Sequence, residues 1–211
     1  MSKNEKGFDR REFLKGTAAV AGATAVGTLA PFGAALAQTG KIKVGLMLPY
    51  TGTFAALGVA ITNGFKLAVE ERGGKLGGRE IEYIVVDDES NPAKAPENAN
   101  KLIQRDKVDV IIGTVHSGVA MGMAKVIREA GTLWINPNAG AGAVTGALCA
   151  PNIFRTSSST WQTTHALGKV LKAKGHKNAV FITWKYAAGE EMMQGFKEGF
   201  EKEGGKLIKE L

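Results

Sequence analysis

Residues 41–65 constrain the fold more than any other stretch, because the sequence pattern changes there within a few positions. Residues 42–48 are apolar enough for a strand buried on both faces, and Pro49 ends regular pairing. After a polar, turn-prone loop at residues 50–54, apolar side chains recur every four positions, which predicts a helix from Ala55. A buried strand that leads through a short loop into a helix is typical of a parallel α/β sheet.

The same unit recurs further along the chain. We expect strands at residues 81–87, 108–112, 133–136 and 153–156, and helices at residues 91–105 and 120–130. The glycine pairs at 73–74 and 77–78 predict only a loose connection before the second strand. Four strand–loop–helix units in succession predict a doubly wound parallel sheet with right-handed crossovers.

A second α/β region follows the polar segment 157–160, which we predict to be a hinge. We expect helices at residues 160–174 and 188–203, and strands at residues 178–184 and 206–211. Two strands are too few for a self-sufficient core, so the pattern predicts a chain that is truncated at its C-terminus. The predicted domains are therefore a first lobe at residues 38–157 and the incomplete start of a second lobe at residues 158–211.

The first 37 residues are typical of an export signal. Residues 10–11 are a twin-arginine pair, a mildly apolar stretch follows at residues 16–30, and residues 35–37 fit an A-x-A cleavage site. This arrangement resembles a bacterial Tat signal peptide that is cleaved after Ala37. We therefore expect a periplasmic protein, and no other segment is apolar and long enough to span a membrane.

Charge, cysteine content and motif spacing argue against several kinds of site. The 27 Lys and Arg residues exceed the 20 Asp and Glu residues only mildly and are dispersed, so nucleic-acid binding is not favoured. The single cysteine, Cys149, is interpreted as a small, at least partly buried apolar residue rather than as a reactive thiol.

Metal and cofactor sites are not favoured either. The acidic run at residues 87–89 lacks the spacing of a calcium loop, so we interpret it as a solvated turn. His165 and His176 show no ligand spacing with each other or with His116, and the glycines of residues 140–146 do not fit a dinucleotide loop. We predict no metal and no cofactor.

Three loops at the carboxyl ends of predicted strands should meet at one edge of the sheet, namely residues 50–54, 115–118 and 136–140. They offer hydroxyl groups, N–H groups at helix starts, a phenol and an imidazole, which together suit a bound anion such as a carboxylate. The side chains concerned are Tyr50, Thr51, Thr53, His116 and Ser117.

Three sequence landmarks occur in the order known from one protein family. They are IKVGLMLPYTGTFAALGVAITNGFKLAVEE, VDVIIGTVHSGVAMGMAKVIREAGTLWINPNAGAG and FRTSSSTWQTTHALGKVL. The chain from Lys41 to Leu211 therefore resembles the type I periplasmic binding proteins, in particular the leucine/isoleucine/valine-binding family that serves ABC importers. The resemblance implies two α/β lobes that are joined by a hinge and close on a small ligand. It also implies a membrane permease as partner and no catalysis.

The resemblance further implies where the ligand contacts lie. In the first lobe they would come from residues 50–54, 116–117 and 138–140, and in the second lobe from residues 185–189. The expected contact positions are Tyr50, Thr51, Thr53, Phe54, His116, Ser117, Asn138, Ala139, Gly140, Tyr186 and Ala188.

Three of these positions depart from the family pattern. Gly140 lies where amino-acid binders usually place a serine or threonine, Ala188 stands where an aromatic residue is often found, and His116 stands where small hydroxyl residues are common. These departures leave room for a flatter or larger acid, such as an aromatic carboxylate, beside an amino acid. A hydrolase that uses Ser117 or Cys149 and a sensory lobe of a larger receptor stay open as alternatives. The hydrolase is disfavoured because no G-x-S-x-G elbow is present.

Overall fold

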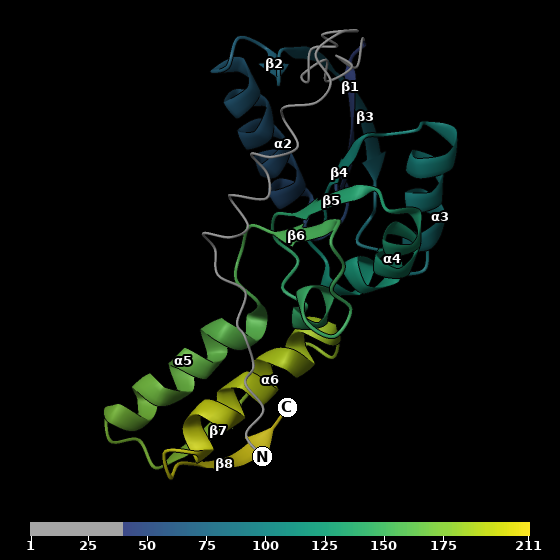
Figure 1. Ribbon diagram of the computed structural model, residues 1–211. Helices are drawn as coiled ribbons and strands as arrows, with labels where there is room; N and C mark the ends of the chain where they lie inside the picture. Colours follow the sequence, from purple (N-terminus) through teal and green to yellow (C-terminus); the bar gives the residue numbers. More distant parts are fainter. Residues whose placement is uncertain (1–39) are drawn as a thin grey trace, which may run out of the picture. The chain divides into compact units, whose positions relative to one another are not determined.

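The computed structural model describes residues 40–211, so the predicted signal peptide and its cleavage site lie outside the described residues (Figure 1). The strands are β1 (Ile42–Leu48), β2 (Lys75–Leu76), β3 (Arg79–Asp87), β4 (Val110–Ile112), β5 (Leu133–Asn136), β6 (Ile153–Arg155), β7 (Asn178–Phe181) and β8 (Lys206–Glu210). The helices are α2 (Ala55–Glu70), α3 (Ala95–Asn100) with a π-helical continuation (Lys101–Arg105), α4 (Ser117–Ala130), a short 3-10 helix (Gly142–Thr145), α5 (Thr160–Ala173) and α6 (Ala187–Glu201).

Six of the strands form one sheet in the order β2-β3-β1-β4-β5-β6. β1 lies between β3 and β4 and pairs with both in parallel, with Leu48 opposite Asp87 and Leu46 opposite Ile112. β5 and β6 extend the sheet in parallel, whereas β2 runs antiparallel to β3. The predicted doubly wound parallel sheet is therefore confirmed.

Two clusters of buried apolar side chains cover the two faces of this sheet. On one face, Val44 and Leu46 of β1 pack with Phe65 of α2. On the other face, Met47 of β1 packs in a cluster with Met123 of α4 and with residues of α3. Figure 1 shows α2 on one side of the sheet and α3 and α4 on the other. β1 is therefore buried on both faces, as its apolar sequence predicts.

The connection between α2 and β3 differs from the prediction. It is a hairpin in which Lys75 of β2 lies opposite Glu80 of β3. Gly77 and Gly78 form the turn with φ values of 55° and 78°, a left-handed conformation that glycine adopts without steric cost. A strand of two residues is too short to show a periodic pattern, which is why the sequence indicated only a loose connection.

The predicted helix at residues 91–105 begins later than expected. Asn91 accepts a hydrogen bond from the N–H of Ala93 at 3.0 Å and so forms a turn, after which α3 begins at Ala95. The last five residues of the predicted helix are π-helical, and Leu102 within them is fully buried. The existence of the helix is thus confirmed, while its start and its regularity are corrected.

β7 and β8 pair in parallel as a separate two-stranded sheet, and α5 and α6 pack against each other. Glycines allow the two helices to approach closely, because a Cβ added at Gly199 would lie 2.1 Å from the carbonyl oxygen of His165. Leu167 and Val170, which share one face of α5 with Leu171, are 45% and 49% exposed. β7 ends at Phe181 rather than at residue 184, so the following residues form a loop.

Candidate functional site

A cavity of about 480 Å³ lies beside the carboxyl ends of β1, β3 and β4, where an open α/β sheet binds its ligands. Three loops that follow these strands contribute to it, together with the loop that joins β7 to α6. The lining residues are Gly52, Thr53, Phe54, Glu89, Ser90, His116, Trp184, Lys185 and Tyr186.

Three rings from distant parts of the sequence meet at this cavity. The ring centroids of Phe54 and His116 are 6.0 Å apart, and those of His116 and Tyr186 are 4.9 Å apart. Phe54 precedes α2, His116 precedes α4 and Tyr186 precedes α6, so each ring stands at the start of a helix. Rings at these spacings form a contiguous aromatic surface, which suits a flat apolar ligand.

His116 has a defined protonation state and orientation. It is the N-cap residue of α4, and its Nδ1 accepts a hydrogen bond from the N–H of Gly118 at 3.0 Å. Burial lowers the pKa of His116 below its ordinary value, although the nearby Asp88 acts in the opposite direction. At neutral pH the ring is therefore uncharged and carries its proton on Nε2. Because Nδ1 is occupied, Nε2–H is the group that remains to donate to a ligand.

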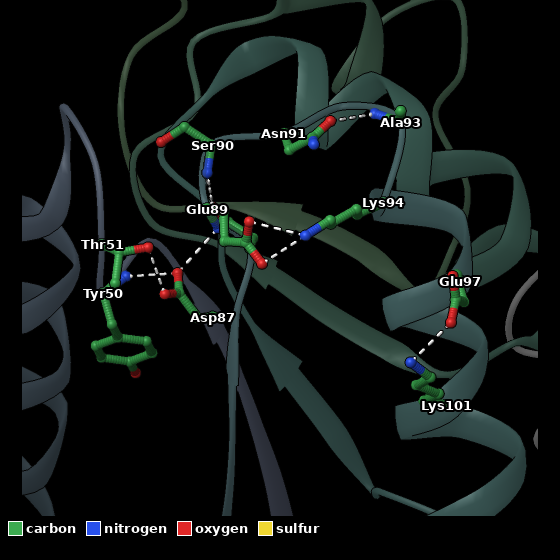
Figure 2. Close-up of polar contacts among 11 residues, drawn as sticks. Tyr50, Thr51, Asp87, Glu89, Ser90, Asn91, Ala93, Lys94, Glu97 and Lys101 are labelled. Carbon is green, nitrogen blue, oxygen red and sulfur yellow. Dashed lines mark hydrogen bonds and ion pairs between the residues drawn. The ribbon is translucent and has the colours of Figure 1, made fainter.

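Asp87, the last residue of β3, joins the loops that follow β1 and β3 (Figure 2). Its carboxylate accepts hydrogen bonds from the N–H of Tyr50 at 2.9 Å, from the hydroxyl of Thr51 at 2.7 Å and from the N–H of Glu89 at 2.9 Å. Partial burial by itself would raise the pKa of Asp87, but these donated hydrogen bonds outweigh it and lower the pKa. Asp87 is therefore an ionised anchor for two of the loops around the cavity.

Asp88 joins β3 to β4 and is fully buried. It accepts hydrogen bonds from the hydroxyl of Thr114, which follows β4, and from the N–H of Ser90 at 2.8 Å. Burial raises the pKa of Asp88, although both hydrogen bonds act against the rise. The prediction that residues 87–89 form a solvated turn is therefore wrong for Asp87 and Asp88, because the neighbouring strands bring hydrogen-bond donors to both.

Glu89 and Ser90 form a turn with an unusual backbone conformation at the cavity. Their φ values are 50° and 54°, in the left-handed region that residues other than glycine rarely adopt. The acceptors Asp87 and Asp88 hold the N–H groups of these two residues. The carboxylate of Glu89 forms an ion pair with Lys94 at 2.7 Å and 2.8 Å, as Figure 2 shows. The backbone of the turn is therefore held by Asp87 and Asp88, and the side chain of Glu89 is held by Lys94.

The expected contact positions fall into two groups. Four of them line the cavity: Thr53, Phe54, His116 and Tyr186. The other seven lie outside the lining, and their environments differ. Tyr50 and Thr51 bind Asp87, while Ser117, Ala139, Gly140 and Ala188 are buried and Asn138 is exposed.

The buried members of the second group support the loops. The carbonyl oxygen of Ala139 accepts hydrogen bonds from Asn136 and Arg155, and that of Gly140 accepts one from the N–H of Thr160 at 3.0 Å. Ser117 lies in the first turn of α4 and is 2% exposed. The predicted helix at residues 120–130 thus begins three residues earlier, because His116 caps it.

Sequence reasoning missed Glu89, Ser90 and Trp184 as lining residues, and it gave Gly52 and Lys185 only as parts of the expected contact loops. Glu89 and Ser90 follow a predicted strand, so the rule that ligands bind at the carboxyl ends of parallel strands could have found them. Trp184 was assigned to the end of the predicted strand at residues 178–184, whereas β7 ends at Phe181 and leaves Trp184 in the loop before α6.

Other reactive groups lie apart from the cavity. Cys149 is exposed, which corrects the expectation of a partly buried residue, since it lies in a turn with its N–H bonded to the carbonyl of Gly146 at 3.0 Å. Within residues 40–211, no group of three or more His, Cys, Asp or Glu side chains is placed to hold a metal ion. In the same part of the chain, no helix is both long and apolar enough to cross a membrane.

Comparison with known protein families gives two matches. Residues 41–211 match a family described as periplasmic binding protein, and residues 7–27 match the signal sequence of the twin-arginine translocation pathway. Together these matches indicate export to the periplasm. Cleavage after Ala37 stays a prediction.

The curated relatives of this chain are named as Leu/Ile/Val-binding proteins. The Leu/Ile/Val-binding protein BraC3 of Rhizobium johnstonii is 34% identical over 160 residues, which cover 74% of this chain and 43% of that protein. The Leu/Ile/Val-binding protein homolog 6 of Brucella abortus is 27% identical over 179 residues, which cover 84% of this chain and 45% of that protein. The chain thus spans about half the length of these curated relatives.

Solved structures extend the comparison to three dimensions. One is a solute binding protein of an ABC transporter from R. palustris in complex with benzoate, which is 56% identical with a TM-score of 0.80. The matched region covers 82% of this chain and 48% of the R. palustris chain. A second is a solute binding protein of an ABC transporter from Rhodopseudomonas palustris BisB5 in complex with 3,4-dihydroxy benzoic acid, which is 33% identical with a TM-score of 0.75. The matched region covers 81% of this chain and 47% of the BisB5 chain. These likenesses confirm the predicted fold class.

Proposed function

This chain belongs to the periplasmic binding protein family, and on that basis we propose that it is an extracytoplasmic receptor for a small aromatic carboxylate. The receptor would deliver its ligand to the membrane permease of an ABC importer and would leave the ligand chemically unchanged. The observation that carries the proposal is the meeting of the Phe54, His116 and Tyr186 rings at one cavity.

The rings suit the aromatic part of such a ligand. A benzene ring packs well against other rings in offset or tilted arrangements, and the interplanar angles of 53° and 41° at His116 are of that tilted kind. A cavity of about 480 Å³ lies within the usual range for small-molecule sites. The benzoate complex of the R. palustris protein, at 56% identity, supports the same ligand class.

The polar lining suits the carboxylate. Lys185 contributes a cation, the hydroxyl of Thr53 can donate a hydrogen bond, and the neutral His116 offers Nε2–H. Hydrogen bonds to a charged acceptor are roughly twice as strong as neutral ones, so few donors suffice.

The named relatives favour a second candidate, a branched-chain amino acid. Such a ligand needs an acceptor for its ammonium group, and Glu89 in the cavity lining is one. The two candidates differ in shape, because only the aromatic acid presents a flat face to the rings.

A hydrolase is less well supported than either receptor. Ser117 does not line the cavity, and Nδ1 of the adjacent His116 is occupied by Gly118, so no nucleophile–base pair faces the ligand. We therefore propose that Ser117 and Cys149 are not nucleophiles, and that no turnover of the ligand occurs.

Isothermal titration of the full chain with benzoate, cyclohexanecarboxylate and leucine tests the proposal. Benzoate should bind most tightly, because cyclohexanecarboxylate keeps the carboxylate but loses the flat ring. Tighter binding of leucine would favour the amino-acid candidate. Absence of binding by all three acids would contradict both receptors.

Two variants of His116 separate the contribution of its ring to ligand binding from its contribution to capping α4. His116→Asn keeps an N-cap acceptor for α4 but removes the ring, whereas His116→Ala removes both. Both should weaken benzoate binding roughly tenfold or more, because a hydrogen bond to a charged group is lost. Only His116→Ala should lower the free energy of unfolding, by about 1 kcal/mol. Unchanged affinity in both variants would remove His116 from the site.

A further inference from the structure

The loop that carries His116 is anchored in the interior of the protein. His116 lines the cavity, whereas Thr114, two residues before it, is fully buried and does not. Val115 between them is also buried. Within residues 40–211, the only hydrogen bond of the His116 side chain is the one that Nδ1 accepts from Gly118 in the helix that it caps. The position of the ring therefore depends on how the backbone before it is held.

Thr114 connects three of the loops at the carboxyl edge of the sheet. Its hydroxyl group donates a hydrogen bond to Asp88, which follows β3. Its carbonyl oxygen accepts a hydrogen bond from the N–H of Ala139, in the loop after β5, at 3.0 Å. The carbonyl oxygen of the preceding Gly113 accepts a hydrogen bond from the indole N–H of Trp134, which is fully buried in β5. The base of the His116 loop is thus fixed by β5 and by two other loops.

The hydroxyl group of Thr114 matters because its partner is a buried carboxylate. One oxygen of Asp88 accepts a hydrogen bond from the N–H of Ser90 at 2.8 Å, and the other accepts from Thr114. A buried carboxylate that loses a donor is strongly disfavoured, so it moves or takes up a proton. Asp88 also lies close enough for its charge to act on His116. A change at Thr114 therefore reaches His116 both through the backbone and through Asp88.

We infer that Thr114 is a positioning residue for the ligand. Its buried hydroxyl group, bound to Asp88, holds the loop after β4 so that His116 presents Nε2–H to the carboxylate of the ligand. Thr114 itself does not touch the ligand. Side chains that contact a ligand keep a productive geometry only where their neighbours fix them. The inference rests on the proposed function, since that proposal makes His116 a ligand contact.

Titration of the full chain with benzoate tests the inference through two variants of Thr114. Thr114→Val keeps the shape of the side chain and removes the hydroxyl group, whereas Thr114→Ser keeps the hydroxyl group and removes a methyl group. Thr114→Val should weaken benzoate binding roughly tenfold, because the hydrogen bond from His116 to a charged group is no longer aligned. Thr114→Ser should stay within about threefold of the unmodified protein, because the hydrogen bond to Asp88 is kept.

Thr164→Val is the matched control for the loss of a threonine hydroxyl group. The hydroxyl of Thr164 donates to the carbonyl of Thr160 at 2.9 Å within α5, and Thr164 does not line the cavity. This variant should leave benzoate affinity within about twofold, because it changes neither the cavity nor the loop after β4.

A double-mutant cycle shows whether Thr114 acts through the ring of His116. In the His116→Asn protein, which has an N-cap acceptor but no ring, Thr114→Val should weaken benzoate binding by less than about twofold further. If Thr114→Val does not fold, Asp88→Asn is introduced into every protein of the cycle, because no buried charge then lacks a donor.

Proton NMR of the ligand-free protein provides a readout that involves no ligand. The chain has three histidines, so His165 and His176 are internal references for His116. Thr114→Val should shift the ring resonances of His116, and Thr114→Ser should restore them. The ring resonances of the other two histidines should stay unchanged in both variants.

The outcomes separate the inference from the proposed function. Benzoate affinity that is unchanged in Thr114→Val, or equally weakened in Thr114→Val and Thr114→Ser, would overturn the inference alone. Additive losses in the cycle with His116→Asn would overturn it as well, and so would His116 resonances that do not shift in Thr114→Val. Absence of benzoate binding by the unmodified protein would overturn the proposed function.

Discussion

Asp87 and Asp88 are neighbours in the sequence but have opposite environments. Asp87 is half-buried and accepts several hydrogen bonds, so its pKa is lowered, whereas Asp88 is fully buried and its pKa is raised. Alternation along a strand explains the difference, because successive side chains point in opposite directions. Asp87 faces the loop after β1, and Asp88 faces Thr114 after β4.

The two acids should respond differently to replacement by asparagine. For Asp87 the folded pKa lies below the ordinary value, so its stabilising effect is present above pH of about 4 and is lost as pH falls through the folded pKa. Asp87→Asn should therefore lower the free energy of unfolding at pH 7 by about 1–3 kcal/mol, with a smaller difference at pH 3.

The effect of Asp88 on stability changes with pH in the opposite direction. Its folded pKa lies above the ordinary value, so ionisation disfavours the fold as pH rises from about 4 through the folded pKa. Asp88→Asn keeps an acceptor for the N–H of Ser90 and removes the charge, so at pH 7 it should be neutral or stabilising. Denaturant unfolding between pH 3 and 8 measures both variants. A loss in Asp88→Asn as large as in Asp87→Asn would contradict this assignment.

At the scale of elements, the start of α2 is fixed by contact with the loop after β1. Gly58 is buried, and a Cβ added there would lie 1.8 Å from the carbonyl oxygen of Pro49. Leu57, although it fits the helical spacing, is 44% exposed. The buried face of the helix start is therefore formed by small residues, which bring Phe54 and its loop close to the sheet.

Two glycines of α2 provide a matched pair for testing this contact. Gly58→Ala should destabilise the protein by about 1–3 kcal/mol, because the added methyl group overpacks against backbone that cannot move freely. Gly64→Ala should stabilise it by up to about 1 kcal/mol, since nothing lies within 4 Å of a Cβ there and alanine favours a helix. Thermal unfolding of both variants measures the difference. Equal effects would show that α2 does not depend on the close approach.

At the scale of the whole described chain, Glu191 of α6 connects segments that are far apart in the sequence. Its carboxylate accepts hydrogen bonds from the N–H of Gly142 at 2.7 Å and from the N–H of Trp161 at 3.4 Å. Burial lowers the pKa of the nearby Arg155, and Glu191 acts against that change. One carboxylate thus joins the loop after β5, the start of α5 and α6.

Replacement of Glu191 should weaken this connection. Glu191→Ala leaves the half-buried N–H of Gly142 without its acceptor, so we expect a loss of about 1–3 kcal/mol in the free energy of unfolding. Glu190→Ala, at the exposed preceding position, should change it by less than about 0.5 kcal/mol. Equal losses in the two variants, measured by denaturant unfolding, would contradict the role given to Glu191.

Much of the fold follows from local sequence patterns. β1 and β5 have the predicted bounds, and the alternation of strands and helices predicts the parallel sheet. Periodicity is a local property, since it records which side chains of one element face the core. The convergence of loops at the carboxyl ends of the strands follows from the same pattern, and it places Thr53, Phe54 and His116 at the cavity.

The sequence by itself thus determined the fold class, the export signal and one side of the site. Only the tertiary structure decided that Asp88 is buried and that Glu89 and Ser90 reach the same cavity as the expected contact residues His116 and Tyr186. The physical reason is that burial and hydrogen-bond partners depend on which elements become neighbours. That choice is made by contacts between residues as distant in the sequence as Asp88 and Thr114, and no spacing along the chain records it.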